Sequence, residues 1–241
     1  MARTPADAAA ALSTALRPAD TPIGIRFLAE KPADVPVFAE THPEPGADGR
    51  TGAVAAGCVF WMHAGQRTFA TLPADHGNCS VGSYTHGLLD LASAAGNDDV
   101  GALLGAGWVR EEDLGAVPAV AERPGAIVYG PLGDAPATPD LVFLRLNAKG
   151  AMVLRDAWPE ARVEGKPQCH IIPLAREHGE VAVSVGCMLS RVRTGMGNDE
   201  LTAAIPGGKL DAVLDALEAA RHADEQVAAY AAQDAKRFTA A

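Results

Sequence analysis

Aromatic residues, basic residues and long apolar runs are all scarce in this sequence. Phe, Trp and Tyr make up 5% of the 241 residues, and 20 Lys and Arg stand against 30 Asp and Glu, which gives a formal charge of −10. Nucleic acids and anionic membrane surfaces bind to basic faces, so this balance argues against both as partners. No stretch approaches the roughly 18 uncharged apolar residues of a membrane-spanning helix. We therefore expect a protein that binds neither nucleic acid nor membrane.

Several functional motifs are also missing. The sequence has no G-x-G-x-x-G or G-x-x-x-x-G-K-[ST] pattern for nucleotides, and no G-x-S-x-G hydrolase pattern. The opening residues, MARTPADAAAALSTALRPAD, include Arg3 and Asp7 and no apolar core followed by a cleavage site, so they do not resemble a secretory signal. We expect a cytoplasmic protein, and cytoplasmic thiols normally stay reduced.

The sequence has only four cysteines, and they form two pairs with none left over. The pairs are Cys58 with Cys79 and Cys169 with Cys187, spaced by 21 and 18 residues, and a glycine follows each second cysteine after eight residues. This self-similarity indicates two distantly related halves. We expect a pseudo-twofold arrangement that gathers all four sulfurs.

The length and the 48% hydrophobic content suffice for a full core. Strands and helices do not alternate strictly, which favours an α+β fold of two loosely repeated halves, with mixed or antiparallel sheets flanked by helices. The expected divisions are an N-terminal helix in 1–20, a single domain in 21–208 made of pseudo-repeats at about 21–107 and 121–208, and a long amphipathic C-terminal helix in 209–241.

Alternation and short apolar runs predict strands, and apolar residues at helical spacing predict helices. The expected strands are 22–30, 58–64, 67–72, 125–130, 141–147, 169–175 and 180–187. The expected helices are 4–17, one directly after Cys79, a short one after Asn97, 149–158, 198–205 and one from 209 onward. The expected connections are a hairpin turn near Gly65, a long surface segment over 31–49 and a loop at 73–77.

Five segments, CVFWMHAG, DHGNCSVGSYTHG, YGPLGDAPATPDLVF, GCMLSRVRTG and DELTAAIPG, together resemble the domain of unknown function 169 family. The resemblance extends from about Thr21 to Gly208, and the combination is specific although each segment alone is weak. It implies a family that is widespread in bacteria and archaea and has no settled activity. The matching positions are Cys58, the loop with His76 and Cys79, Cys169, and the segment from Cys187 to Gly195.

The four thiols allow several interpretations. Structural zinc sites usually draw ligands from C-x2-4-C knuckles, and no two cysteines here are that close in the sequence. Compact ferredoxin spacing is absent as well, but iron–sulfur clusters accept widely spaced thiolates, and two cysteines from each half suit a [4Fe–4S] cluster. A cluster is the favoured interpretation. Zinc, a redox or catalytic thiol pair, and cysteines buried simply as core residues remain open.

Two histidines near the second cysteine could act at such a site. His76 stands three residues before Cys79, whereas Ser184 holds that place before Cys187, so His76 is the candidate proton donor or weak ligand. A role within the turn DHGN is its alternative. His86 either faces the site or bonds locally.

Arginines and glycines complete the candidate site. Arg191 and Arg193 are two residues apart and would project together from an extended segment toward an anionic group, with surface ion pairing as the alternative. Glycines let the backbone approach a ligand closely, although turn formation alone would also explain them. The cofactor-binding candidates are Gly77, Gly82 and Gly186.

These observations favour a cytoplasmic redox protein or enzyme with an iron–sulfur cluster; if it is an enzyme, it is an oxidoreductase or a lyase. The alternative is a non-catalytic protein that binds zinc or a small ligand and whose cysteines are structural. The expected partners are a redox protein or a small-molecule substrate, and a homodimer is compatible with the sequence.

Overall fold

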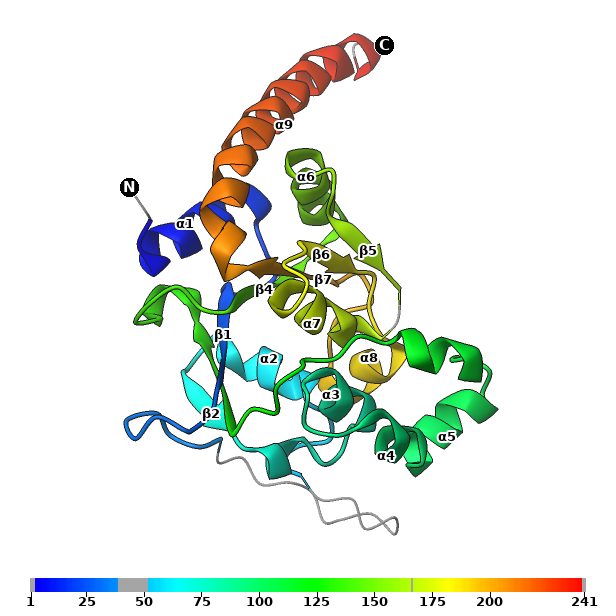
Figure 1. The fold of residues 1–241 in the computed structure, drawn as a ribbon. Helices are drawn as coiled ribbons and strands as arrows, with labels where there is room; N and C mark the ends of the chain where they lie inside the picture. The colour runs from blue at the N-terminus through cyan, green and yellow to red at the C-terminus, as the bar shows by residue number, and fades with distance from the viewer. Residues whose placement is uncertain (1–2, 39–51, 166, 240–241) are drawn as a thin grey trace.

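The centre of the molecule is a mixed sheet. The structure, a computed structural model, describes residues 3–38, 52–165 and 167–239. Its strands lie in the order β2-β3-β1-β4-β7-β6-β5, and neighbours are antiparallel except for the parallel pair β5 and β6 (Figure 1). The strands are β1 (Ile23–Leu28), β2 (Phe69–Thr71), β3 (Ala126–Pro131), β4 (Leu141–Leu146), β5 (Arg162–Glu164), β6 (Ala182–Ser184) and β7 (Leu201–Pro206).

The strand order is the same when it is read outward from the middle of the sheet. On one side of the middle, β1 is followed by β3 and then β2. On the other side, β4 is followed by β7 and then β6, and β5 is an additional strand at that edge. When β5 is set aside, the outer strand of each set, β2 or β6, is the second strand of that set along the chain. The two sets meet where β1 pairs antiparallel with β4, Ile23 to Phe143 and Ile25 to Leu141, as a local twofold relation requires. The boundaries expected for the pseudo-repeats, at residues 107 and 121, stay a prediction.

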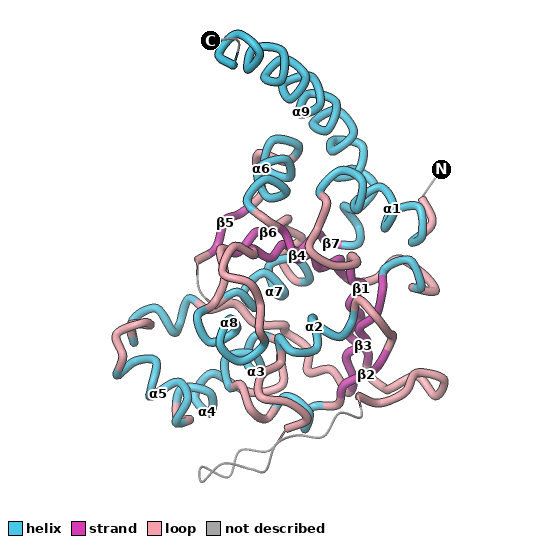
Figure 2. The backbone as a smooth tube through the Cα atoms, turned by 180° about the vertical axis from the view of Figure 1, so that it is seen from behind, coloured by secondary structure: helices cyan, strands magenta, loops and turns pink. Residues whose placement is uncertain are grey.

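Helices cover both faces of the sheet (Figures 1 and 2). The α-helices are α1 (Pro5–Leu16), α2 (Cys58–Ala64), α3 (Ser80–Thr85), α4 (Leu91–Ala95), α5 (Asp98–Gly105), α6 (Ala148–Ala157), α7 (Ile171–Arg176), α8 (Met188–Thr194) and α9 (Leu210–Thr239). The 3-10 helices are η1 (Pro73–His76), η2 (Glu111–Ala116), η3 (Leu132–Asp134), η4 (Gln168–His170) and η5 (Gly207–Lys209).

Each face of the sheet has its own apolar core, because alternate strand residues point to opposite sides. One core joins α1, α6 and α9 to strand residues such as Val142 and Ile205. The other joins α2 and α7 to strand residues such as Ile25, Tyr129 and Phe143. The second core also contains Cys169 and therefore adjoins the thiols.

Many of the sequence predictions are confirmed. In α1 the Thr4 side chain accepts from the backbone N–H of Asp7, Pro5 begins the helix, and Ala8, Leu12 and Leu16 are buried. The α+β class, the strands at β1, β2, β3, β4 and β6, the helices α5 and α6, and the long helix α9 also agree. The expected connection over 31–49 lies largely outside the described residues.

Three segments differ from the prediction. Residues 58–64 form α2 rather than a strand, so no hairpin turns at Gly65: Phe60, Trp61 and Ala64 are buried, which is the spacing of a helix face. Residues 169–175 form η4 and α7, because a short, fully apolar run carries no period that separates strand from helix. Residues 201–206 form β7 rather than a helix.

The prediction of a helix at 198–205 was wrong because tertiary packing in the sheet outweighs the intrinsic helix propensity of this segment. Leu201–Pro206 lies between β4 and β6 and bonds to both, which places it inside the sheet. Thr202, Ala203 and Ala204 are completely buried there. Ala is a good helix former, but burial on both faces of a central strand overrides that weak preference.

The long helix α9 packs its first turns on α1 and α6 and then extends away from the rest of the molecule (Figures 1 and 2). Leu210, Val213, Leu214 and Leu217 are buried in its first turns, whereas Val227, Tyr230 and Phe238 further along are exposed. None of the described helices is both long enough and apolar enough to cross a membrane.

We expect Phe143→Ala to be among the costly substitutions in this core. Phe143 is fully buried on β4, and its ring lies 4.4 Å from that of Trp61, centroid to centroid. Loss of a buried aromatic ring costs about 3–5 kcal/mol. Val163→Ala on the edge strand β5, where the side chain is 52% exposed, is the control and should change stability by at most about 0.5 kcal/mol. Equilibrium denaturant unfolding measures both, and equal effects would contradict this packing.

Candidate functional site

All four cysteines line one cavity. They lie beside the core that contains Trp61, and each is a free thiol. Cys58 begins α2, Cys79 and Cys187 are the N-cap residues of α3 and α8, and Cys169 lies in η4. The cavity has about 550 Å³ of atom-free space including its open side.

The two cysteine pairs are delivered by the same order of elements. In the first pair, Cys58 begins a helix, the three-residue strand β2 follows, and Cys79 caps the next helix. In the second pair, Cys169 lies directly before α7, the three-residue strand β6 follows, and Cys187 caps α8. Each pair therefore lies within the connections of its own set of strands, and the pairing of β1 with β4 brings the two sets together.

The thiols are close enough to affect each other's charge. Burial raises the pKa of Cys58 to about 12, raises that of Cys79, and raises that of Cys169 well above its ordinary value. Repulsion between thiolates raises these pKa values further. This repulsion acts between Cys58 and both Cys79 and Cys187, between Cys79 and Cys187, and between Cys169 and each of the other three. Every cysteine thus interacts with every other.

Hydrogen-bond donors lie against two of the sulfurs. The backbone N–H of Gly82 points to Cys79 Sγ at 3.4 Å, and the Ser190 hydroxyl bonds to Cys58. Thr85 Oγ1 donates to the Gly82 carbonyl at 3.0 Å, and the same hydroxyl lowers the pKa of Cys169 without offsetting burial, as Ser190 does for Cys58. Behind Ser190, Gln168 Nε2 donates to its Oγ at 2.7 Å, which leaves the hydroxyl proton for Cys58. These donors stabilise a thiolate more than a thiol.

Within the described ranges, no group of three or more His, Cys, Asp and Glu side chains is placed so that it could hold a metal ion. Thiolates on one zinc each lie about 2.3 Å from the metal and so crowd together. In a cluster each thiolate binds a different iron, so the sulfurs stay further apart.

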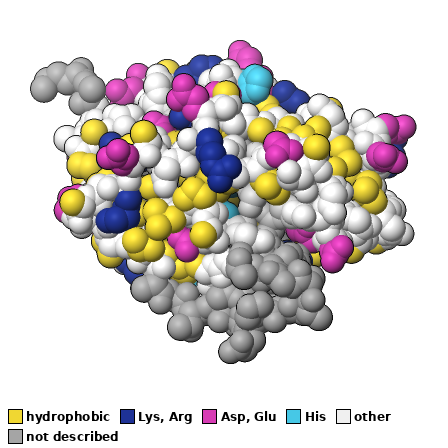
Figure 3. Space-filling model, turned by 60° about the horizontal axis from the view of Figure 1, so that its bottom comes forward, with side chains coloured by type: hydrophobic (Ala, Val, Ile, Leu, Met, Phe, Trp, Pro, Cys, Tyr) yellow, Lys and Arg dark blue, Asp and Glu magenta, His cyan; other side chains and the backbone are white. Residues whose placement is uncertain are grey.

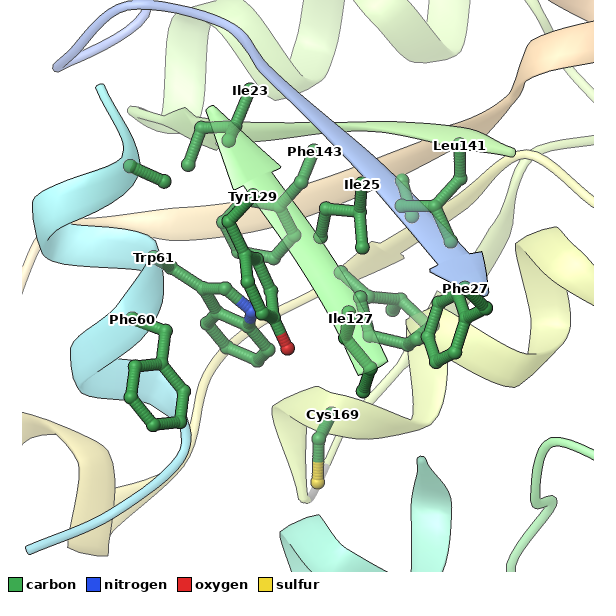
Figure 4. Close-up of a cluster of buried hydrophobic side chains, with 14 of the residues drawn as sticks. Ile23, Ile25, Phe27, Phe60, Trp61, Ile127, Tyr129, Leu141, Phe143 and Cys169 are labelled. Carbon is green, nitrogen blue, oxygen red and sulfur yellow. The ribbon is translucent and has the colours of Figure 1, made fainter. Parts of the chain in front are cut away.

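Large apolar side chains form much of the cavity wall. Trp61, Trp108, Val81, Leu103 and Leu189 line it. In Figure 4 the Cys169 sulfur points away from the aromatic and aliphatic side chains of the neighbouring core. Figure 3 shows the end of the molecule opposite α9, where hydrophobic side chains gather between charged ones.

His86 lies at the cavity, whereas His76 is not among the residues that line it. His86 is 2% exposed, and burial lowers its pKa to about 4, so the ring is neutral near pH 7. His76 lies behind it, with ring centroids 5.7 Å apart. Burial, with a smaller contribution from His86, holds the pKa of His76 well below its usual range. His76 Nε2 lies 2.9 Å from the Thr71 hydroxyl.

The two arginines have different surroundings. Arg193 lines the cavity, bonds to the carbonyl of Asn78 at 3.4 Å and lowers the pKa of Cys79 by its charge. Arg191 does not line it, and both arginines lie on the helix α8, so the prediction of an extended segment was wrong. The Arg191 guanidinium donates to the carbonyls of Val185, Gly197 and Glu200 and so braces the backbone around α8.

Of the three candidate glycines, Gly82 is the one that lines the cavity. A Cβ at Gly82 would lie 3.3 Å from Cys79 Sγ, so a larger residue would crowd the sulfur. Gly77 ends η1, and Gly186 adopts φ +115°, a conformation that favours glycine, directly before Cys187. These two shape the turns that deliver the cysteines.

Sequence reasoning missed several residues of the cavity, namely Asp99, Trp108, Gln168 and Ser190. The sequence positions of two of them could have indicated a place near the thiols. Gln168 adjoins Cys169, and Ser190 lies three residues after Cys187, about one helical turn. Asp99 lies in the first turn of α5, accepts from the backbone N–H of Ser80 at 2.9 Å, and raises the pKa of Cys79 by its charge. Nothing in the sequence singled out Trp108.

The chain belongs to the domain of unknown function 169 (DUF169) family, described as uncharacterised. A sequence model of that family matches residues 11–216, and the family predicted from the five segments is confirmed. No curated protein and no solved structure matched the chain.

The raised thiol pKa values predict slow alkylation of the metal-free protein. With a pKa of about 12 rather than 9, Cys58 has about 1000-fold less thiolate at pH 8 than it has in the unfolded chain. We expect iodoacetamide to modify folded Cys58 at least that much more slowly than the chain unfolded in guanidinium, as measured by peptide mass spectrometry. Between about pH 9 and 12 the unfolded chain loses thiol protons first, so folding stability should fall. A Cys58 alkylation midpoint at or below pH 9 would contradict this environment.

Proposed function

We propose that this member of the DUF169 family binds an iron–sulfur cluster of the [4Fe–4S] type through Cys58, Cys79, Cys169 and Cys187. It acts in the cytoplasm as a redox protein or an enzyme. The observation that carries the proposal is the convergence of all four thiols, two from each set of strands, on one cavity.

The donor set suits a cluster better than the other interpretations. A reactive thiol pair needs a lowered pKa, whereas burial raises the pKa of three of these thiols. Structural zinc usually draws its thiolates from tight C-x2-4-C knuckles, and these four cysteines are widely spaced in the sequence. Core cysteines need no hydrogen-bond donors, yet two of these sulfurs have one. Metal binding would deprotonate the thiols and release protons.

The surroundings also suit redox chemistry. Trp61, Trp108 and Leu103 give the cavity an apolar lining, and low polarity together with hydrogen bonds to sulfur sets a cluster's potential. Four thiolates would close the cluster for electron transfer to a redox partner. Three would leave one iron open to a small-molecule substrate, for oxidoreductase or lyase chemistry. Arg193 at the cavity would then attract an anionic group.

The first test is the metal content of protein purified without oxygen. We expect about four iron and four acid-labile sulfide per chain, with a brown colour. Cys79→Ala or Cys187→Ala should strip the cluster and lower the thermal midpoint, because the ligands join the two sets of strands. The matched control is Met188→Ala, next to Cys187 on α8 but 60% exposed, which should retain the metal. Stoichiometric zinc without iron, or full metal in both cysteine variants, would refute the proposal.

A second test concerns the donor to Cys58. A hydrogen bond to a ligating sulfur stabilises its charge and raises the reduction potential. Ser190→Ala should therefore lower the cluster's midpoint potential while iron content stays unchanged. Thr194→Ala is the control, because it removes a hydroxyl one turn further along α8 that bonds to the Ser190 carbonyl rather than to sulfur. Redox titration compares the two, and an equal shift in both would show that Ser190 does not act on the cluster.

A further inference from the structure

His86 presents an unpartnered nitrogen at the thiol cavity. The side chain is 2% exposed and lines the cavity together with the four cysteines. Nε2 is buried and has no hydrogen-bond partner. A buried polar atom without a partner costs about 1–3 kcal/mol, so its retention calls for an explanation.

The contacts of Nδ1, the other ring nitrogen, determine whether Nε2 carries a proton. Nδ1 lies 2.8 Å from the carbonyl oxygen of Gly82, which can only accept a hydrogen bond, and 3.2 Å from the Thr85 hydroxyl, whose proton goes to the same carbonyl. Nδ1 therefore carries the proton, and in the neutral ring Nε2 keeps a lone pair. Only a Lewis acid or a polar hydrogen would satisfy that lone pair.

The same geometry is typical of metal-binding histidines. A ligating imidazole almost always donates its second N–H to a backbone carbonyl or a carboxylate, which sets the tautomer and the ring orientation. Gly82 provides that carbonyl, and its own N–H bonds to Cys79 Sγ. One residue thus positions both a thiol and the imidazole.

We propose that Nε2 of His86 is a ligand to one iron in this cavity, in place of one of the four thiolates. The inference rests on the proposed function and refines it. The cavity lining offers five donors, and a four-iron cluster takes one protein ligand per iron, so three thiolates and the imidazole would complete it. A neutral imidazole on an iron raises the reduction potential relative to thiolates alone. That iron is also the one at which an anionic substrate would displace a neutral ligand.

His76 offers a matched control. It is equally buried, and its ring lies 5.7 Å from that of His86. Its Nδ1 is also without a partner, but its Nε2 bonds to Thr71 and the residue does not line the cavity. Replacement of His76 should therefore disturb the same core without removal of an iron ligand.

The experiment compares the parent, His86→Ala and His76→Ala, each purified without oxygen and labelled with ¹⁵N-histidine. Iron analysis comes first, and pulsed electron paramagnetic resonance of the reduced cluster then detects nitrogen bound to iron. We expect a strong coupling that changes with the label in the parent and in His76→Ala and is lost in His86→Ala. Circular dichroism monitors folding, and His86→Gln serves as a second variant if His86→Ala does not fold.

The remaining outcomes would contradict the inference, and they distinguish failure of the imidazole ligand from failure of the cluster proposal. Full iron without a histidine coupling in the parent, or a coupling that survives loss of His86, would refute the imidazole ligand and leave the cluster proposal intact. A coupling lost in His76→Ala alone would assign the ligand to His76. Absence of iron in the parent would refute the proposed function itself, and the imidazole ligand with it.

Discussion

The pairing of β1 with β4 is the contact on which the site depends. Three residue pairs join these strands, and through them two sets of strands with the same outward order become one sheet. Each set carries one cysteine pair in its connections, on the face covered by α2 and α7. Antiparallel pairing of β1 with β4 places the two sets side by side, and all four cysteines line the same cavity. Without that contact each set would offer two isolated thiols.

Burial then determines the chemistry of those thiols. A cavity lined by Trp61, Trp108 and Leu103 keeps Cys58, Cys79 and Cys169 protonated, because desolvation disfavours the thiolate. The N–H of Gly82 and the hydroxyls of Ser190 and Thr85 counteract this only in part. Nucleophilic catalysis would need the opposite balance. Under the proposed function, a bound metal would supply the missing positive charge, and the thiolates would form when the metal binds.

The sequence revealed the convergence of the cysteines and missed part of its geometry. Repeated spacing exposed the relation between the pairs, and strong periodicity predicted α1, β1 and α9 correctly. Residues 58–64 and 169–175 were assigned to strands because short apolar runs have no decisive period. The segment 201–206 was assigned to a helix because its place between β4 and β6 is a tertiary fact. His76 attracted attention through a difference between the repeats, yet the break between α3 and α4, where Gly87 adopts φ +74°, places His86 at the cavity.

Several polar atoms around the cavity are buried without hydrogen-bond partners, and this indicates what kind of occupant the cavity suits. Nε2 of His86, Nε1 of Trp61 and Oε1 of Gln168 are buried without partners, and all three residues line the cavity. Cavities that stay dry are apolar, and waters enter where several polar groups converge. This lining combines apolar walls with thiols and isolated polar atoms, so it suits neither a dry void nor a well-bonded water cluster. Apolar substitutes at these positions would remove the cost of the unpaired atoms. Their presence is understandable if an occupant with both a polarisable surface and Lewis-acid character restores the missing interactions, and iron with inorganic sulfide has both.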